Sequence, residues 1–413
     1  MRFSYIIAGF ISAVTGIPVY ANTITVGATE PMKNISSAIA AAKKGDTVLV
    51  NAGTYREKNL VINKSIFLIG NNQPVLDGEG KYEMITVHAG DVSINGFQFL
   101  HAGYSSREDY AAIKLNSCRN VTIAGNIFSD AHFGVYVQQS VSCRISDNVF
   151  IGGKGNESTS GDGIHCWKSD SLQIIHNNIQ QFRDGIYLEF VTNSLIWRNS
   201  SVNNIRYGLH FMTAHNNAYV TNIFKNNGAG VAVMYTHGVK MLNNYFMNNT
   251  GDAAFGLLLK EITDSNISGN HFLNNTTGIF MEGCNRIDMQ QNLFKENGWA
   301  LKIEANCSDV MVERNDYIAN TFDVSTNGTL MLNTFNNNYW DKYEGYDLNK
   351  DKIGYVPYRP VSMYSMMAEQ NPALMMLFRS FITTLMDKTE KVIPSLIPQD
   401  LKDAHPLMKP FSS

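Results

Sequence analysis

Apolar and polar positions alternate over short segments through most of this chain. A small residue followed by an apolar residue, any residue and a second apolar residue recurs at positions 134, 163, 185, 208, 230, 256, 278 and 300. Asparagines, most of them followed within two residues by an apolar or aromatic residue, recur in the same phase, at Asn126, Asn148, Asn178, Asn199, Asn222, Asn244, Asn270, Asn292 and Asn315. Both series step by about 22 residues and lengthen together, around 152–161 and near 250–254. The two patterns therefore belong to one repeat.

Each unit of the repeat holds alternating segments of a few residues separated by Asn, Gly and Ser, with no room for a long helix. Period-two strands in a repeat of this length predict an all-β fold, a right-handed parallel β-helix whose coils stack on one another. Leucine-rich repeats share the period, but their leucine consensus is absent. We expect the asparagines to stack at equivalent turns, where they tolerate left-handed backbone and hydrogen-bond along the stack. Residues 22–340 then form one elongated β-helix.

Both ends of the β-helix are expected to carry helices. Apolar residues between Ile35 and Ala42 share one helical face, which suits a lid on the first coil, and strands at 47–50, 60–62 and 66–69 follow. The repeat stops after residue 340, and residues 341–413 form a carboxy-terminal extension. Pro372 suits a first helical turn. The apolar residues Leu374, Leu377, Phe378, Phe381, Leu385 and Met386 share one face of the expected helix. That face either packs on the last coil or contacts a membrane partner.

Residues 1–21 have the pattern of a Sec-type signal peptide. A basic amino terminus precedes an apolar run from Tyr5 to Val19, and Ala21 is a suitable small residue for cleavage. A membrane anchor is the alternative, but the run is shorter than the ~20 apolar residues that a span needs. The sequence therefore predicts export to the periplasm, with cleavage after Ala21.

Composition excludes several function classes. The chain has 413 residues, a net charge of −3 and 17% charged residues, so we expect no nucleic-acid partner, which would need a strong basic excess. Five cysteines cannot all pair with one another, which argues against a disulfide scaffold. Cys284 and Cys307 occupy one column on adjacent coils, where either a disulfide or two free thiols would fit.

The repeat also indicates which side chains face outward. If the apolar residues of the glycine motif point inward, those two and four positions after the glycine point outward. This places Met212 beside Met234 on adjacent coils, and a later turn position places His215 beside His237, with His210 near them. Thioether and imidazole ligands suit Cu(I), so these five residues are a candidate metal site. The alternative is an apolar patch that contacts a protein partner.

A second motif has the spacing of a metal loop. Asp347, Asn349 and Asp351 follow the one-three-five order of oxygen ligands in calcium loops. Lys352 stands where such loops need glycine, and no suitable acidic residue closes the loop. A polar turn is the better interpretation, and calcium is not expected.

Some β-helices cleave or epimerise acidic polysaccharides, so a lyase or epimerase acting on uronans is the alternative function. Polysaccharide hydrolases with this fold need paired carboxylates. Lyases need a base, a metal ion or arginine that neutralises the uronate charge, and a basic groove that binds the substrate. The outward columns offer Glu189, Lys260, Glu282 and Glu304, but no arginine and no paired aspartate, and Asp162 suits a turn. We therefore expect no enzyme activity, although fold alone does not decide function.

Several motifs carry a family resemblance. They are the segments 161–168 (GDGIHCWK), 206–212 (RYGLHFM), 230–235 (GVAVMY), 256–261 (GLLLKE), 338–346 (NYWDKYEGY), 357–361 (PYRPV), 369–372 (EQNP) and 405–410 (HPLMKP). Together they resemble the NosD family of nitrous oxide reductase maturation proteins, over essentially the whole mature chain. The carboxy-terminal motifs are the specific ones, because generic β-helices lack them.

The resemblance implies a periplasmic, non-enzymatic subunit that sits on an ABC transporter made of the permease NosY and the ATPase NosF. It implies a role in assembling the copper–sulfide centre of nitrous oxide reductase, with copper supplied by the chaperone NosL. The outward Met and His columns then become a transient Cu(I) or chaperone-contact site. The expected permease contact, which is also the membrane contact, is the apolar set Met363, Met366, Met367, Met375, Phe378 and Phe381.

Overall fold

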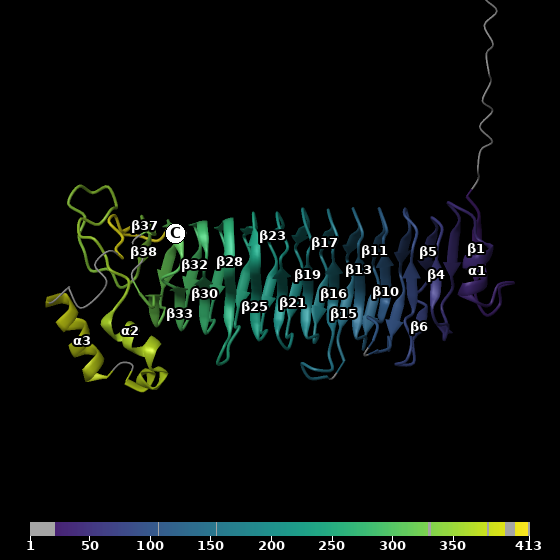
Figure 1. The fold of residues 1–413 in the computed structure, drawn as a ribbon, viewed down its shortest axis with the longest axis horizontal. Coiled ribbons are helices and arrows are strands. Elements are labelled where there is room, and N and C mark those ends of the chain that lie inside the picture. The colour runs from purple at the N-terminus through teal and green to yellow at the C-terminus, as the bar shows by residue number, and fades with distance from the viewer. Residues whose placement is uncertain are drawn as a thin grey trace, which may run out of the picture.

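The protein is an elongated β-solenoid with a helical arm at its carboxy-terminal end (Figure 1). The computed structural model describes residues 21–105, 107–153, 155–328, 332–377, 380–392 and 401–411. Residues 1–20 of the expected signal peptide lie outside the described residues. The parallel β-helix predicted from the repeat is confirmed.

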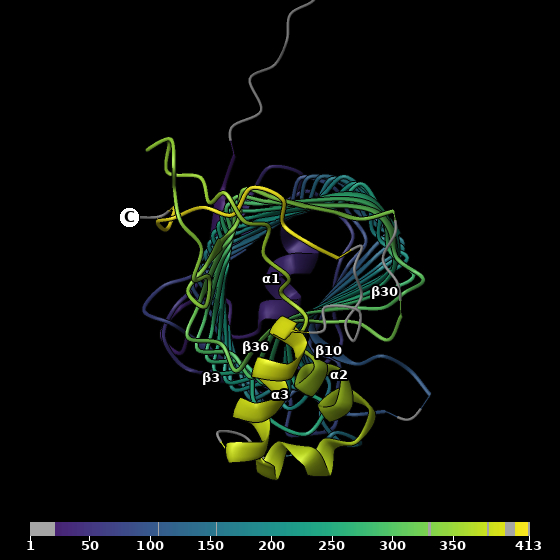
Figure 2. The ribbon, with the colours of Figure 1, turned by 90° about the vertical axis from the view of Figure 1, so that its left-hand side faces the viewer.

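The coils contribute strands to three parallel ladders, which Figure 2 shows end-on. Ladder 1 consists of β4 (Leu60–Ile62), β7 (Ile85–Val87), β10 (Ala111–Asn116), β13 (Phe133–Gln138), β16 (Asp162–Trp167), β19 (Asp184–Glu189), β22 (Tyr207–Met212), β25 (Ala229–His237), β28 (Phe255–Ser268), β30 (Thr277–Glu282), β33 (Trp299–Ile303) and β36 (Phe322–Ser325). Ladder 2 consists of β1 (Thr23–Val26), β2 (Thr47–Val50), β5 (Phe67–Gly70), β8 (Ser93–Asn95), β11 (Thr122–Ala124), β14 (Arg144–Ser146), β17 (Gln173–Ile175), β20 (Leu195–Trp197), β23 (Ala218–Val220), β26 (Lys240–Leu242), β31 (Asn285–Gln290), β34 (Ser308–Glu313) and β37 (Thr334–Asn336), and it is joined to ladder 1 through the long β28. Ladder 3 consists of β3 (Thr54–Tyr55), β6 (Val75–Asp77), β9 (Gln98–Leu100), β12 (Ile127–Ser129), β15 (Val149–Ile151), β18 (Asn178–Gln180), β21 (Ser200–Val202), β24 (Ile223–Lys225), β27 (Tyr245–Met247), β29 (His271–Leu273), β32 (Leu293–Lys295), β35 (Asp316–Ile318) and β38 (Tyr339–Trp340).

The glycine motif forms the strands of ladder 1. In β16 the residues one and three places after the glycine are buried, and those two and four places after it are partly exposed on the outer face. The glycine itself is required by close packing between coils. A Cβ at Gly208 would lie 2.7 Å from the carbonyl oxygen of Gly230, on the next coil. Stacked aromatic rings fill the interior behind ladder 3, as between Phe272 and Phe294, whose centroids are 4.8 Å apart.

A buried asparagine stack follows the turn between ladders 2 and 3. Its members are Asn126, Asn148, Asn177, Asn199, Asn222, Asn244, Asn270, Asn292, Asn315 and Asn338. The backbone N–H and Nδ2 of each asparagine donate to Oδ1 of the next, as from Asn222 to Asn244 at 2.9 and 3.0 Å. The predicted stacking is thus confirmed.

Two details of that prediction are wrong. Asn177, and not Asn178, belongs to the stack, and the side chain of Asn178 is exposed on β18. The left-handed backbone also falls one residue earlier than expected. Thr221, at φ 55°, precedes Asn222 in this conformation. The asparagine that follows is buried and directs its amide into the solenoid, where Nδ2 of Asn222 donates to the carbonyl oxygen of Ile196.

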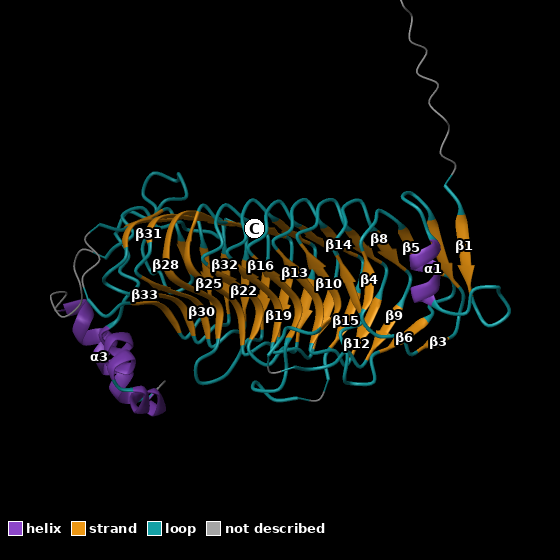
Figure 3. Cartoon of the chain, turned by 45° about the vertical axis from the view of Figure 1, so that its right-hand side comes forward, coloured by secondary structure: helices purple, strands orange, loops and turns teal. Residues whose placement is uncertain are grey.

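The amino-terminal end is closed by α1 (Ile35–Ala41), as predicted, with Ile35, Ala38 and Ile39 buried. Figure 3 shows α1 at the opposite end of the solenoid from the helical arm. The first strands also lie where they were expected, apart from a shift of the 66–69 strand to β5 (Phe67–Gly70).

The carboxy-terminal extension departs from the prediction of one amphipathic helix. It contains α2 (Met363–Gln370), the 3-10 helix η1 (Pro372–Leu377) and α3 (Phe381–Val392). A separate start for α3 is favoured by Ser380, because its Oγ accepts the backbone N–H of Thr383 at 3.4 Å, as a capping side chain does. The one expected apolar face is therefore divided: Leu374, Leu377 and Met386 pack against a buried cluster, whereas Phe381 and Leu385 are exposed.

After the arm the chain returns to the last coil and closes it. Oδ2 of the fully buried Asp403 accepts from the backbone N–H and Nδ2 of Asn338 at 2.9 and 3.0 Å, and from Nε1 of Trp340 at 3.1 Å. A carboxylate thus takes the place of the next asparagine in the stack. Both ends of the arm are consequently fixed to the solenoid.

Two smaller features complete the fold. Cys284 and Cys307 are both buried free thiols, and the N–H of Cys284 lies 3.4 Å from the sulfur of Cys307. The carboxylate of Asp347 accepts the backbone N–H groups of Asp351 and Lys352, as in a polar turn.

Candidate functional site

The outer face of ladder 1 carries the expected methionine pair. Met212 on β22 and Met234 on β25 are direct partners in the parallel register, and both side chains are partly exposed. Their neighbours in the same column are Glu189 before them and Lys260 after them. The structure therefore places two thioethers side by side, between an acidic and a basic residue of the same column.

The two turn histidines are also neighbours. The rings of His215 and His237 stack with centroids 4.0 Å apart and planes inclined by 19°. The backbone N–H of His237 donates to Nδ1 of His215 at 3.3 Å, so the neutral His215 ring carries its proton on Nε2. Burial and the neighbouring His237 lower the pKa of His215. Stacked rings direct their nitrogen lone pairs along parallel planes rather than toward a common point.

His210 lies in a different environment from the one that its outward direction suggested. It faces away from the solenoid interior, but its side chain is only 5% exposed, because the rings of Tyr187 and Tyr207 cover it at 4.6 and 4.8 Å. Its Nδ1 lies 3.4 Å from Oδ2 of Asp184, which is itself 1% exposed. Among the described residues, neither ring nitrogen of His210 nor this carboxylate oxygen has a hydrogen-bond partner.

A second acidic residue lies next to this group, one coil earlier. Asp162 is in register with Asp184 on adjacent strands, and its buried carboxylate contacts Nδ1 of His165 at 2.8 Å and Nη2 of Arg183 at 2.9 Å. The expectation that this face has no arginine and no paired aspartate is therefore wrong, as is the turn assignment of Asp162. Both aspartates precede the glycine of their motif, a position that resembles a turn in sequence but begins a strand here.

The expected partner-contact residues are divided between exposed and covered positions on the arm. Met367 and Phe381 are 43% and 80% exposed, whereas Met363 and Met366 are half-buried. Met375 lies in η1, and Phe378 lies outside the described residues. Exposed Met376, Ile382 and Leu385 extend the apolar surface. None of the helices in the described part of the chain is long and apolar enough to span a membrane.

The arm is attached to the same outer face that carries the methionines. The carboxylate of Glu369 in α2 contacts Nζ of Lys302 at 2.7 Å and Oγ of Ser325 at 3.1 Å. Beside these contacts, Trp299, Phe322, Tyr364 and Ala368 form a buried apolar cluster between ladder 1 and α2. Lys302 occupies the same column of ladder 1 as His210, four strands further along.

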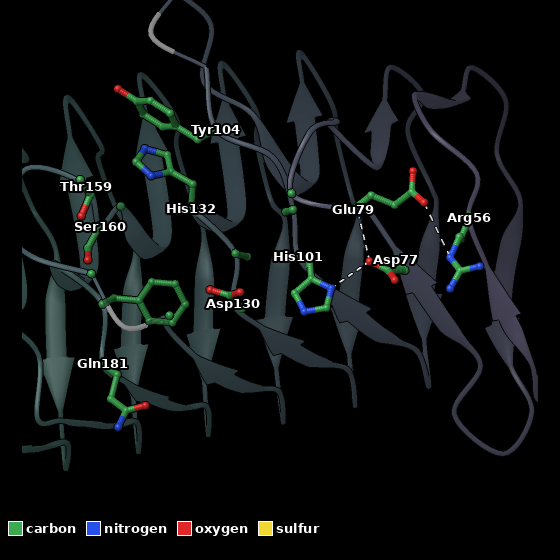
Figure 4. Close-up of a pocket in the computed structure, with 17 residues that line it drawn as sticks. Arg56, Asp77, Glu79, His101, Tyr104, Asp130, His132, Thr159, Ser160 and Gln181 are labelled. Carbon is green, nitrogen blue, oxygen red and sulfur yellow. Dashed lines mark hydrogen bonds and ion pairs between the residues drawn. The ribbon is translucent and has the colours of Figure 1, made fainter.

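A polar groove of about 650 Å³ follows the turns after ladder 3 in the amino-terminal half. Figure 4 shows His101 directed toward Asp77 and Arg56 toward Glu79, at 2.9 and 3.7 Å. The hydrogen bond from His101 lowers the pKa of Asp77. Sequence reasoning missed this groove, although the long loop at 152–161, which lines it in part, was visible as a lengthened step of the repeat.

Family comparisons match the chain in two overlapping parts. Residues 153–349 match the family described as periplasmic copper-binding protein (NosD), and residues 20–216 match a family of unknown function, DUF1565. Two curated relatives bear the name "Probable ABC transporter binding protein NosD". The Stutzerimonas stutzeri protein is 24% identical over 81% of this chain and 80% of its own length. The Pseudomonas aeruginosa PAO1 protein is 26% identical over 87% of each chain.

Solved structures share the fold with little sequence identity. The Dettilon tailspike protein aligns with a TM-score of 0.59 at 13% identity, covering 73% of this chain and 66% of its own. PfbA, a surface adhesin of Streptococcus pneumoniae, aligns with a TM-score of 0.50 at 14% identity, covering 70% and 86%. These likenesses support the solenoid and carry no functional information.

Proposed function

Because this chain belongs to the NosD family, we propose that it is a periplasmic accessory protein for maturation of nitrous oxide reductase. In this role it receives Cu(I) as cargo and presents it for assembly of the copper–sulfide centre. It works with an ABC transporter, the permease NosY and the ATPase NosF, and with the chaperone NosL. The protein acts by binding and handover, without catalysis of its own.

The observation that carries this proposal is the shared outer face of ladder 1. Met212 and Met234 lie at its middle, and α2 is attached to it at β33 and β36. With neighbouring strands ~4.8 Å apart, three strand steps from β25 to β33 correspond to ~14 Å. A soft-metal ligand pair and the docked arm are thus close enough to act on one partner or to influence one another.

The geometry of the methionine pair suits transfer better than storage. Two thioethers bind Cu(I) weakly compared with thiolates, and they leave coordination positions open for a ligand from a donor or an acceptor protein. Partial exposure gives such a partner access. The neighbouring Lys260 is paired with Glu282 at 2.8 Å, so it does not present an uncompensated positive charge to the cation.

The arm is the proposed contact with the transporter. Phe381, Ile382 and Leu385 on α3 are at least half exposed, an arrangement that suits an apolar surface of the permease outside the bilayer. Because the arm is anchored by Glu369 on one side and by the segment around Asp403 on the other, a force on the arm reaches the last coils. We infer that transporter movement is transmitted along this route.

A maturation assay tests the proposal. Cells that make the Met212→Leu/Met234→Leu protein should accumulate it at normal levels and yield nitrous oxide reductase without its copper–sulfide centre, as read from absorption spectra and metal content. Met311→Leu is the matched control, since Met311 is an exposed methionine on ladder 2. A fully metallated, active reductase in the double-variant background contradicts the copper role.

A uronan lyase or epimerase is the second candidate, because Asp162, Asp184 and Arg183 supply the carboxylate pair and the arginine that such enzymes need. Incubation of the purified protein with alginate or pectate distinguishes the two functions. The accessory role predicts neither unsaturated-uronate absorbance nor a change in uronate composition. Either signal, lost in Asp162→Asn, supports the enzyme instead.

A further inference from the structure

His210 is a buried histidine whose nitrogens are not used by the fold. Its side chain is 5% exposed, and within the described residues neither Nδ1 nor Nε2 has a hydrogen-bond partner. A buried polar group left in this state costs about 1–3 kcal/mol. A buried group in this state calls for a specific explanation, and a bound ion is one of the recognised ones.

The carboxylate of Asp184 is placed to fix one tautomer of the His210 ring. Oδ2 of Asp184 lies 3.4 Å from Nδ1 and 3.9 Å from Nε of Arg183, and it has no hydrogen-bond partner in the described part of the chain. Oδ1 of the same carboxylate accepts the backbone N–H of Tyr207 at 3.2 Å, which holds the group in place. A small rotation of the ring completes an Nδ1–H to Asp184 hydrogen bond. The proton is then on Nδ1, and the lone pair of Nε2 is free.

A carboxylate on one nitrogen and a free lone pair on the other is the arrangement of a metal-binding histidine. The second requirement is further ligands within reach. Met212 lies two residues after His210 on the same outer face of β22, ~7 Å along the strand, and Met234 is its register partner on β25. Long, flexible thioether side chains can close that distance.

We propose that Cu(I) binds to Nε2 of His210 and to the sulfur atoms of Met212 and Met234, and that Asp184 is a positioning residue that keeps the His210 proton on Nδ1. The inference rests on the proposed function, since it takes the cargo to be Cu(I), and it names the ligands of that cargo. No redox step is involved, because the ion enters and leaves as Cu(I).

The donor set also selects against other metals. Among the described residues there is no group of three or more His, Cys, Asp or Glu side chains that could hold a metal ion. Zinc, calcium and magnesium therefore lack a complete set of the ligands they prefer. One imidazole and two thioethers form a soft, incomplete site, which suits Cu(I).

This assignment leaves His215 and His237 outside the metal site. Nδ1 of His215 already accepts the N–H of His237, and the two rings are stacked. Either ring would have to turn before both could bind one ion. Their stacking instead stabilises the turn that follows the methionine strands.

The Asp184→Asn substitution is a sharp test because it reverses the tautomer while conserving shape. The amide oxygen can still accept the N–H of Tyr207, and the amide NH₂ now faces Nδ1 of His210 as a donor. Nδ1 must then accept, the proton moves to Nε2, and the lone pair that binds copper is lost. Asp162→Asn is the matched control: Asp162 is equally buried and contacts His165 one coil earlier, where the next outward residue is Trp167 and not a thioether. Asp162 also accepts from Arg183, and the amide oxygen of asparagine can still accept that contact.

The experiment is an anaerobic competition titration of the full mature protein against a chromophoric Cu(I) chelator. We expect one Cu(I) per chain. We also expect 10–100-fold weaker binding in Asp184→Asn, the range typical of a lost carboxylate partner, and at least that loss in His210→Gln and in Met212→Leu/Met234→Leu. Asp162→Asn and His215→Gln/His237→Gln should stay within about threefold of wild type. Binding lost with the His215/His237 pair, or kept within threefold in Asp184→Asn, overturns this ligand set. A wild-type protein that binds no Cu(I) overturns the proposed cargo itself.

A second readout does not depend on a variant that folds. Long-range ¹H–¹⁵N spectra of the metal-free wild-type protein should show His210 with its proton on Nδ1, and Ag(I), a redox-inert probe for Cu(I), should shift Nε2. A His210 proton on Nε2 contradicts the role of Asp184. In Asp184→Asn the His210 proton should move to Nε2. The thermal unfolding midpoint of this variant should fall no further than that of Asp162→Asn.

Discussion

The asparagine stack and the outer face of β19, β22 and β25 both bury polar side chains, but with opposite outcomes. In the stack each amide satisfies the next, as Asn222 and Asn244 do, and the series ends on a carboxylate. On the outer face the ring nitrogens of His210 and Oδ2 of Asp184 are buried without a hydrogen bond in the described part of the chain. The asparagine stack has the same residue on every coil, as expected where only stability is required. The outer face has different residues on each coil, and the buried groups without hydrogen bonds are where we expect a ligand.

The largest effect should come from the stack itself. Asn177→Ala removes the acceptor for the N–H and Nδ2 of Asn148 and the donor to Ile145. Leaving these groups buried and unpaired should lower the free energy of unfolding by about 2–4 kcal/mol, measured by urea denaturation. Asn178→Ala is the adjacent control, exposed on β18, and should change it by less than about 0.5 kcal/mol. Equal effects would contradict the placement of Asn177 in the stack.

The end of the stack should be somewhat less sensitive. Asp403→Ala leaves the backbone N–H and Nδ2 of Asn338 and Nε1 of Trp340 without their carboxylate. We expect a loss of about 2 kcal/mol, because water can reach a terminal coil more easily than an internal one. Hydrogen exchange should accelerate in the last coil and not near β16. Uniform acceleration would mean that Asp403 stabilises the whole solenoid.

The methionine pair should matter little for stability. Met212 and Met234 are partly exposed, and leucine conserves their volume, so Met212→Leu/Met234→Leu should cost less than about 1.5 kcal/mol. The urea midpoint should stay near that of the wild type while Cu(I) binding is lost. A strongly destabilised double variant would mean that Met212 and Met234 have a structural role, as the stacked asparagines do, and would contradict their assignment to ligand binding.

The smallest effect should be the pH dependence at the stacked histidines. Burial and His237 lower the pKa of His215 from its ordinary 6.5, so the folded protein takes up this proton less readily than the unfolded chain. Its contribution to stability is complete above pH ~6.5 and is lost as the pH falls through the folded value. The free energy of unfolding should therefore fall between pH 7 and pH 5, with a shallower slope in His215→Gln. An unchanged slope would show that His215 does not titrate differently in the two states.

The repeat could be predicted because successive coils pack the same kinds of residue, small, apolar and asparagine, at equivalent positions. The glycine column, the strands of ladder 1 and the capping helix α1 follow directly from periodicity. The sequence does not distinguish Asn177 from Asn178, because both are asparagines and only the structure shows that Asn177 faces inward. The left-handed position was missed because residues as different as His176, Arg198 and Thr221 occupy it, so it has no residue signature.

The outer face was less predictable, since contacts between coils decide it. Periodicity predicted that Met212 lies beside Met234 and His215 beside His237. It could not show that the rings of Tyr187 and Tyr207 cover His210. It also did not show that Asp184, which precedes a glycine, lies beside His210. The division of the arm into η1 and α3 was hidden because both contain apolar residues at helical spacing.

The measurement that tests this account most directly is X-ray absorption at the copper edge of the wild-type protein loaded with one Cu(I) per chain. The account predicts two sulfur scatterers and one nitrogen scatterer, with the nitrogen absent in His210→Gln. A spectrum with only nitrogen or oxygen neighbours, or one that His210→Gln leaves unchanged, would contradict it.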